Sequence, residues 1–168
     1  MHKFARILKH RWLDEADARR ALPPAALQRL RQRVQASEAL HSGQIRLCVE
    51  ASLPMSYLTR DADARERALA MFGKLGVWDT EHNNGVLIYL LLAEHRVELV
   101  ADRGVDRQVA DERWQGIVGS MSAAFAQGRL EDGLNEAIDA VGSLLVEHFA
   151  LAPGQTPVNE LPDEPDIR

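Results

Sequence analysis

The stretch NNGVLIYLLLAEHRVELVAD, residues 83–102, decides the fold of this 168-residue chain. Residues 86–93 within it are apolar throughout, which is typical of a central strand that is covered on both faces. A short polar segment, EHR at 94–96, follows directly, and residues 97–102 then alternate between apolar and polar side chains. This pattern predicts an antiparallel hairpin of two strands joined by a tight turn.

A third strand is predicted upstream of the hairpin, where residues 44–50 read QIRLCVE. Ile45, Leu47 and Val49 fall on one face of this segment and the other side chains fall on the opposite face, which predicts a strand with one well-buried face. Residues 61–75, between this strand and the hairpin, carry apolar side chains at helical spacing. A strand–helix–strand unit prefers parallel strands joined by a right-handed crossover.

Further helices are predicted on both sides of this unit. Residues 111–127 and 130–149 carry apolar side chains at helical spacing, and another helix follows Pro23 and Pro24. Residues 51–60 are predicted to be a loop. The predicted fold class is therefore α/β: an α/β/α sandwich in which helices cover both faces of a small mixed β-sheet.

The expected organisation has three parts. A basic amphipathic helix is expected at residues 1–22, the α/β domain at 23–150, and a Pro-rich acidic tail at 151–168. The tail shows neither a helical nor a strand period, so it is expected to be either disordered or ordered only by contact with the domain.

The N-terminal segment places Phe4, Ile7, Leu8 and Trp12 at helical spacing among Lys, Arg and His residues. Such a helix could lie on an anionic membrane through residues 1–20, or dock on a partner. Alternatively, its apolar stripe packs on the domain or on a second subunit, which we consider the more common outcome for a short helix. A protein partner is expected, and this partner could be associated with a membrane.

Composition excludes several classes of protein. Charged residues make up 27% and apolar residues 46% of the chain, with a net charge of -5 and a pI near 5.7, so a nucleic-acid partner is not expected. The single cysteine, Cys48, excludes an internal disulfide and is expected to be buried and inert. The apolar runs are too short for a membrane helix or a signal peptide. A cytoplasmic location is therefore expected.

The predicted topology gathers polar residues at one end of the sheet. If the strands at 44–50 and 86–93 are parallel, their starting ends lie at one edge, and the finishing end of the antiparallel strand at 97–102 joins them. The residues expected on this edge are His41, Asp79, Glu81, His82, Asn83, Asn84, Asp102, Arg103 and Asp106, whereas Glu50, Glu94 and His95 are expected at the opposite edge.

Hard oxygen donors at this edge suggest a metal site. The carboxylates of Asp79, Asp102 and Asp106, with an amide of Asn83 or Asn84, are ligands that Ca²⁺ or Mg²⁺ would accept. Nothing in the sequence indicates an organic cofactor. The alternative is structural: the acidic residue that follows the hairpin caps a turn, and the Asn-Asn-Gly segment supplies left-handed backbone.

Two other residue types at this edge allow alternative interpretations. His41 could act as a general base because its ordinary pKa lies near neutral pH, although a histidine at a helix end more often satisfies a carbonyl. Trp78 and Trp114 are interpreted as packing anchors.

Several blocks of the chain together resemble the TPM domain family. They are HSGQIRLCVE at 41–50, NNGVLIYL at 83–90, VELVADRG at 97–104 and NELPD at 159–163. The likeness is to the short proteobacterial form without signal peptide or membrane anchor. It marks the family-signature positions His41, Asn83, Asn84, Gly85, Asp102, Arg103, Gly104 and Trp114.

The resemblance implies an α/β/α sandwich and leaves two functions open. Bacterial members that accompany membrane proteins imply a non-catalytic interaction or accessory module linked to envelope or membrane-protein assembly, which is the reading we favour. Reports of calcium binding and of a plant acid phosphatase in the family imply the alternative, a metal-dependent phosphatase-like hydrolase. In that case Arg103 would hold the phosphate beside the metal.

Overall fold

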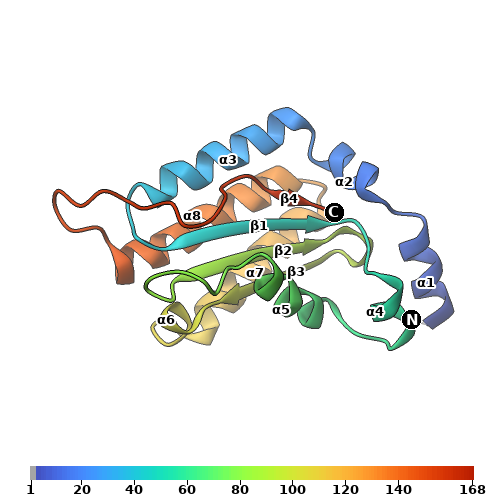
Figure 1. The fold of residues 1–168 in the computed structure, drawn as a ribbon. Coiled ribbons are helices and arrows are strands. Elements are labelled where there is room, and N and C mark those ends of the chain that lie inside the picture. Colours follow the sequence, from blue (N-terminus) through green and yellow to red (C-terminus); the bar gives the residue numbers. More distant parts are fainter. Residues whose placement is uncertain (1–2) are drawn as a thin grey trace.

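The computed structural model describes residues 3–168 (Figure 1). Residues 1–2 of the predicted N-terminal segment lie outside the described residues. The elements run in the order α1 (Lys3–Arg11), α2 (Glu15–Ala21), α3 (Pro24–Glu38), β1 (Gln44–Glu50), α4 (Met55–Thr59), α5 (Ala64–Lys74), β2 (Gly85–Leu91), the 3-10 helix η1 (Leu92–Glu94), β3 (Arg96–Ala101), α6 (Arg103–Asp106), α7 (Asp111–Ala126), α8 (Leu130–Phe149) and β4 (Asp166–Ile167).

The sheet has four strands in the order β3-β2-β1-β4. β1 runs parallel to β2, and β2 pairs with β3 in an antiparallel hairpin. The predicted mixed α/β sheet is therefore confirmed. The fourth strand, β4, lies parallel to β1 at the outer edge and was not predicted, because two residues are too few to show a strand period.

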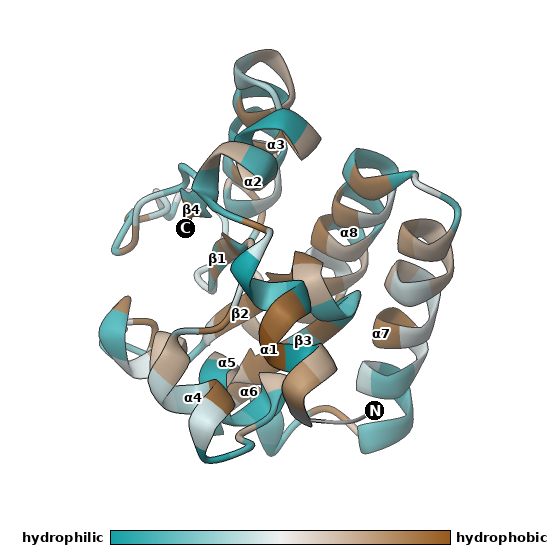
Figure 2. Ribbon diagram, turned by 90° about the vertical axis from the view of Figure 1, so that its right-hand side faces the viewer, coloured by the Kyte–Doolittle hydropathy of each residue, from teal (hydrophilic) through white to brown (hydrophobic). Residues whose placement is uncertain are grey.

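Helices pack on both faces of the sheet, as predicted (Figure 2). The face that carries Ile45, Leu47 and Ile88 packs against α3, α7 and α8. The opposite face, which carries Cys48 and Tyr89, packs against α5. The alternation of side chains along each strand therefore divides the core into two layers. Cys48 is fully buried, as expected, and burial raises the pKa of its thiol.

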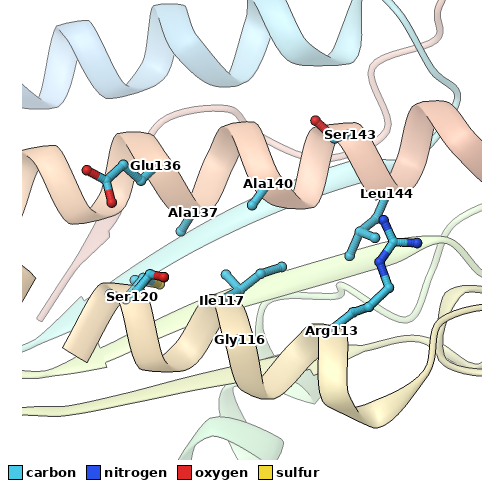
Figure 3. Close-up of a pocket in the computed structure, with 10 residues that line it drawn as sticks. Arg113, Gly116, Ile117, Ser120, Glu136, Ala137, Ala140, Ser143 and Leu144 are labelled. Carbon is cyan, nitrogen blue, oxygen red and sulfur yellow. The ribbon is translucent and has the colours of Figure 1, made fainter. Parts of the chain in front are cut away.

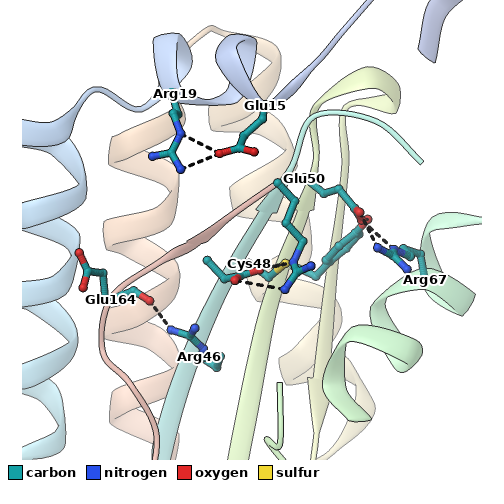
Figure 4. A network of polar contacts seen from close by, with 10 residues as sticks. Glu15, Arg19, Arg46, Cys48, Glu50, Arg67 and Glu164 are labelled. Carbon is teal, nitrogen blue, oxygen red and sulfur yellow. Dashed lines mark hydrogen bonds and ion pairs between the residues drawn. The ribbon is translucent and has the colours of Figure 1, made fainter. Parts of the chain in front are cut away.

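Both faces of β1 are buried, although the sequence predicted burial for only one. Arg46 is only 7% exposed and Glu50 only 4%. The guanidinium of Arg67 in α5 makes two hydrogen bonds to Glu50, at 2.9 and 2.6 Å, and the Tyr89 hydroxyl donates a third at 2.7 Å (Figure 4). These partners neutralise and satisfy the carboxylate, so that a charged side chain is accommodated in the interior.

The tail at 151–168 is ordered by contact with β1. Two tail residues, Glu160 and Leu161, donate their N–H groups to the side-chain carbonyl of Gln44, at 2.8 and 3.0 Å. The Arg46 guanidinium donates to carbonyl groups at two tail positions, one of them Glu164 (Figure 4). The polar side chains of β1 therefore bind the tail, and the periodicity of apolar residues in the sequence does not reveal such contacts.

One local prediction needs correction. The segment 51–60 is not a continuous loop, because Pro54 occupies the N-cap of the short helix α4, and a fixed φ near −65° suits this position.

Within residues 3–168, no helix combines the length and the apolar character needed to cross a membrane.

Candidate functional site

The loop that precedes β2 and the loop that follows β3 meet at one end of the sheet. Asp102 donates its N–H to the Gly85 carbonyl at 2.8 Å, and Gly104 donates to the Asn83 carbonyl at 2.9 Å. Residues 41–43 lie beside them, because Gln44 donates its N–H to the Asn84 carbonyl. The predicted juxtaposition is confirmed. We call this end the rim and define it as residues 41–43, 79–85 and 102–106.

Two signature glycines allow the rim loops to approach so closely. A Cβ atom on Gly85 would lie 2.1 Å from the carbonyl oxygen of Val77, and one on Gly104 would lie 2.5 Å from that of Asn83. Both distances are far below van der Waals contact, and the obstacles are backbone atoms. Glycine at these positions is therefore required by close backbone packing.

Asn84 is the most buried polar residue of the rim loop, with no exposed surface. Its N–H donates to the Thr80 hydroxyl at 3.0 Å and its side-chain amide donates to the Ser42 hydroxyl at 3.2 Å. Its amide oxygen, Oδ1, is buried and has no hydrogen-bond donor among residues 3–168. Buried acceptors are rarely left unpaired, so this oxygen is an exception among the buried polar atoms of the rim.

Asp102 shows the same feature from the other loop. It is 6% exposed, and its Oδ1 accepts the N–H of Arg103 at 2.7 Å, which caps the short helix α6. The second oxygen, Oδ2, is buried and finds no donor in the described part of the chain. The rim therefore contains two unpartnered buried oxygens, one neutral and one charged, on the two loops that the backbone hydrogen bonds hold together.

His41 is held in a structural arrangement. It is fully buried; its Nδ1 lies 3.0 Å from the Gly43 carbonyl and its Nε2 lies 3.1 Å from the Ser37 hydroxyl. The carbonyl can only accept, so Nδ1 carries the proton and Nε2 accepts from the hydroxyl. Burial lowers the pKa of His41, which favours this neutral ring. The geometry favours a histidine that satisfies a carbonyl over a general base.

The remaining rim candidates point to solvent. Asp79, Glu81, His82, Asn83, Arg103 and Asp106 are all exposed. Asn83 adopts a positive φ of 51°, in agreement with the left-handed backbone considered for this segment. Among the described residues, no group of three or more His, Cys, Asp and Glu side chains is arranged to hold a metal ion. The predicted set of Asp79, Asp102 and Asp106 stays a prediction, and Asp102 is its one buried member.

Trp114 lies outside the rim. It lines a groove along β3, together with Asp106 and residues of α5 and α7. The signature therefore marks two adjoining places, the rim and the groove beside it.

A second groove runs between α7 and α8 (Figure 3) and encloses about 400 Å³. Small residues such as Gly116, Ala140 and Ser143 make up half of its lining, and Arg113 lies at one end in the close-up. It contains no cluster of reactive groups.

Sequence reasoning missed the residues that support the rim. Thr80 and Ser42 position Asn84 through their hydroxyls, and the Glu160 carboxylate of the tail accepts the N–H of Glu81 at 2.8 Å. A serine next to His41 and a threonine four residues before Asn84 carry no distinctive spacing. The tail contact could not be foreseen because it joins residues 79 positions apart.

A buried carboxyl pair lies under the tail, near the start of β1. Glu38 accepts the Ile45 N–H at 2.7 Å, and burial, together with the nearby Asp163 carboxylate, raises the pKa of Glu38 to about 8. Asp163 itself accepts hydrogen bonds from the amides of Gln35 and Asn159, both at 2.9 Å. The NELPD block thus contributes, through Asp163, the carboxylate that lies near Glu38.

Together, the fold and the rim define a small α/β/α sandwich whose polar site is built by loops at one end of the sheet. The family model of the TPM domain matches residues 16–144, most of the chain. The chain belongs to the TPM domain family.

Solved structures support the assignment. The NMR structure of the BA42 protein from the psychrophilic bacterium Bizionia argentinensis has 25% sequence identity to this chain and a TM-score of 0.75, over 86% of this chain and 94% of that one. The N-terminal domain of a P. gingivalis protein has 24% identity and a TM-score of 0.63, over 78% and 82% of the two chains, and shows the fold alone. No curated protein matches this chain.

Proposed function

We propose that this TPM-domain protein is a non-catalytic accessory module that docks on the surface of an anionic membrane through α1. The observation that carries the proposal is an apolar stripe on that helix that nothing in the described chain covers. Docking of this kind would place the domain beside membrane proteins, which fits the expected role in envelope or membrane-protein assembly.

One side of α1 is fixed to the domain. Arg6 donates to the Glu94 carboxylate at 2.6 Å, and the ring Nε2 of His10 lies 2.9 Å from the same oxygen. The other ring nitrogen of His10 accepts the Leu53 N–H at 2.9 Å, so Nε2 is the donor. Burial raises the pKa of Glu94, but the bonds from Arg6 and His10 outweigh it and hold the pKa below its ordinary value. The helix is therefore anchored by an ionised carboxylate.

The other side of α1 faces solvent. Phe4 is 80% exposed, Leu8 49% and Trp12, just beyond the helix end, 79%. Their spacing of four residues places them in one row along the helix, and Figure 2 shows α1 in front of the sheet with hydrophobic positions, in brown, along its ribbon. Ile7, the remaining residue of the predicted stripe, packs against the domain, so the proposal rests on Phe4, Leu8 and Trp12.

The chemistry of this side suits a membrane interface. Full burial of a large apolar side chain contributes about 1.5–3 kcal/mol, and Trp and Phe are favoured at the headgroup level. Lys9 and Arg11 flank the stripe and are exposed, and the first turn contains no acidic residue. An amphipathic helix of this composition lies in the plane of an anionic surface.

The test is co-sedimentation of the protein with vesicles that contain phosphatidylglycerol, at low and at high salt. The double variant Phe4→Ser/Trp12→Ser should reduce bound protein at least tenfold without changing the circular dichroism spectrum. Val158→Ser is the matched control, because Val158 is 70% exposed but belongs to the tail. Equal binding by the double variant and the parent would disprove the proposal, as would binding that is absent from both.

A second candidate function rests on the two unpartnered rim oxygens. Asn84 Oδ1 and Asp102 Oδ2 are donors that fit a hard divalent cation, and they are the residues that would hold Ca²⁺ or Mg²⁺. A bound cation would polarise a phosphate oxygen as a Lewis acid. Exposed Arg103 beside it would then attract the phosphate charge. These features favour the phosphatase-like alternative as the runner-up.

Calorimetric titration with Ca²⁺ and with Mg²⁺, combined with turnover of p-nitrophenyl phosphate, separates the two candidates. The hydrolase predicts cation-dependent turnover that Asp102→Asn abolishes and that the control Glu112→Gln, exposed on α7 outside the rim, retains. The accessory module predicts no turnover with either cation. Asp102→Asn keeps an oxygen for the α6 cap, so a folding defect is not expected to confuse the result.

A further inference from the structure

Strand β3 forms an edge of the sheet, because β2 pairs with one side of it only. Hydrogen-bonded and non-hydrogen-bonded pairs alternate along an antiparallel ladder. The bond from Asp102 N–H to the Gly85 carbonyl fixes which pairs are bonded. Even-numbered residues of β3 therefore bond to β2, and odd-numbered residues turn their N–H and C=O groups to the free side.

The free side of β3 carries main-chain hydrogen-bond donors and acceptors. Within residues 3–168, the N–H groups of Val97, Leu99 and Ala101 donate to no other element. The Leu99 carbonyl accepts a hydrogen bond from the Arg65 guanidinium of α5, which agrees with an outward orientation. A charged side chain over an exposed strand is one of the ways in which proteins protect a sheet edge from uncontrolled pairing.

The free edge is the floor of a groove. Helix α5 forms one wall and α7 the other, and the groove encloses about 620 Å³. We call it the β3 groove and define it by Arg65, Leu69, Asp106, Asp111, Trp114 and Val118, with residues 98–101 as its floor. Its walls combine apolar surface with a few polar groups, as in sites that bind extended segments.

Two observations indicate the chemistry of an occupant. The indole N–H of Trp114 is buried and has no acceptor in the described chain, so it can donate to a carbonyl of an incoming backbone. The carboxylates of Asp106 and Asp111 take part in no ion pair involving residues 3–168 and are exposed at the α6–α7 side of the groove. Their charge is complementary to a Lys or Arg side chain.

We propose that the β3 groove binds an extended, unstructured peptide segment of a protein partner, which adds as a strand to the free edge of β3 and places a basic side chain against Asp106 and Asp111. The peptide backbone pairs with the outward groups of Val97, Leu99 and Ala101. Addition of a strand to a sheet edge supplies affinity through the main chain and specificity through alternate side chains. Arg65 gives up the Leu99 carbonyl when the peptide enters.

The probe for this proposal is a labelled peptide of alternating valine and threonine with a Lys-Arg pair at one end, made in both chain directions. The control peptide carries N-methyl groups on every second residue, which removes strand pairing and retains composition. Fluorescence anisotropy should show binding of at least one probe and a loss of at least tenfold for its methylated form. Amide hydrogen exchange at Leu99 and Ala101 should slow when the probe binds.

Two variants test the groove separately. Ala101→Pro removes an outward N–H and leaves the β2 ladder intact, because proline is tolerated on an edge strand, and it should abolish binding. If this variant does not fold, the double variant Asp106→Lys/Asp111→Lys leaves the backbone unchanged and should weaken binding at least tenfold. Glu112→Lys is the matched control, since Glu112 is exposed on α7 but does not line the groove.

Three results would overturn the proposal. They are equal binding of the methylated probe, no binding of either probe at about 1 mM, and protection of the Leu99 amide that grows with protein concentration without peptide. The last result would show that the edge pairs with a second copy of this chain instead.

Discussion

The two edges of the sheet differ in how their hydrogen-bonding groups are satisfied. The outer edge of β1 is covered by the tail of the same chain, which lies along it and ends as β4 (Figure 1). At the outer edge of β3, the Arg65 side chain is the one group among residues 3–168 that bonds to an outward main-chain atom, and a groove lies beside it. One edge is thus completed within the molecule, and the other keeps main-chain groups available.

The β1 edge is closed by backbone and by side chains together. The backbone ladder with β4 spans two residue pairs, Cys48 with Asp166 and Val49 with Ile167, and Arg168 adds backbone hydrogen bonds to Val49 and Ala51. The side chains of Gln44 and Arg46 make further contacts with the tail, and these residues are 1% and 7% exposed. Because both are buried and polar, they depend on the tail for their partners. In the described part of the chain, no side chain of β3 is a buried polar group without a partner, so this edge does not depend on a covering segment in the same way.

Removal of residues 159–168 should have the largest effect, because it would turn the β1 edge into an open one. Gln44 and Arg46 would lose their partners, and Leu161, 7% exposed, would leave the core. Each lost hydrogen bond contributes about 0.5–1.5 kcal/mol net and the burial of Leu161 about 1.5–3 kcal/mol. We therefore expect the free energy of unfolding to fall by about 3–5 kcal/mol in urea titrations.

Val158→Ser is the control for this truncation, since the exposed Val158 side chain borders the deleted segment. Its unfolding free energy should stay within about 0.5 kcal/mol of the parent. A truncated protein as stable as this control would show that the two edges are equivalent and that the tail merely rests on β1.

The pH dependence of the covered edge should give an intermediate effect. The raised pKa of Glu38, about 8, means that the folded protein binds a proton that the unfolded chain releases near its ordinary pKa. Stability from this group is complete at acidic pH, falls as the pH rises through neutral, and is lost above pH 8. Glu38→Gln mimics the protonated form, so the variant should exceed the parent in stability at pH 9 by about 1–3 kcal/mol.

The comparison is made by urea titration of parent and variant between pH 5 and pH 9, with Glu112→Gln as the exposed control. The difference between Glu38→Gln and the parent should shrink toward acidic pH, where both forms carry a hydrogen at this position. A constant difference over the whole range would mean that Glu38 does not titrate within it.

The sequence predicted what periodicity and topology determine. Alternation placed β1 at 44–50, and the antiparallel hairpin brought Asn84 and Asp102 to one end of the sheet, as the backbone contacts confirm. Periodicity is a local property, so it could not show that Arg46 and Gln44 bind a tail more than a hundred residues away. It could not show either which side of α1 packs, because the spacing of Phe4 and Trp12 is the same in both cases.

The local nature of periodicity also explains why the sequence did not place Trp114 in the β3 groove. Its position on α7 was predicted correctly, but a helical pattern does not tell which part of the sheet the helix covers. Only the packing of α7 on β3 places this indole in the groove and away from the rim loops. The unpaired atoms that mark the rim and the groove are likewise three-dimensional properties, because burial and missing partners depend on neighbours distant in sequence.

The smallest expected change in stability comes from the open edge, and it is the sharpest test of the difference. Arg65→Ala removes the guanidinium from the Leu99 carbonyl, and the Arg65 side chain is 47% exposed, so the free energy of unfolding should change by less than about 0.5 kcal/mol. Affinity for the bound probe peptide should rise several-fold in anisotropy titrations, because the peptide no longer displaces Arg65. Arg113→Ala is the control, since Arg113 is 46% exposed and pairs with Glu147 outside the groove. A destabilisation beyond about 1 kcal/mol with no gain in affinity would mean that Arg65 completes the β3 edge as the tail completes the β1 edge.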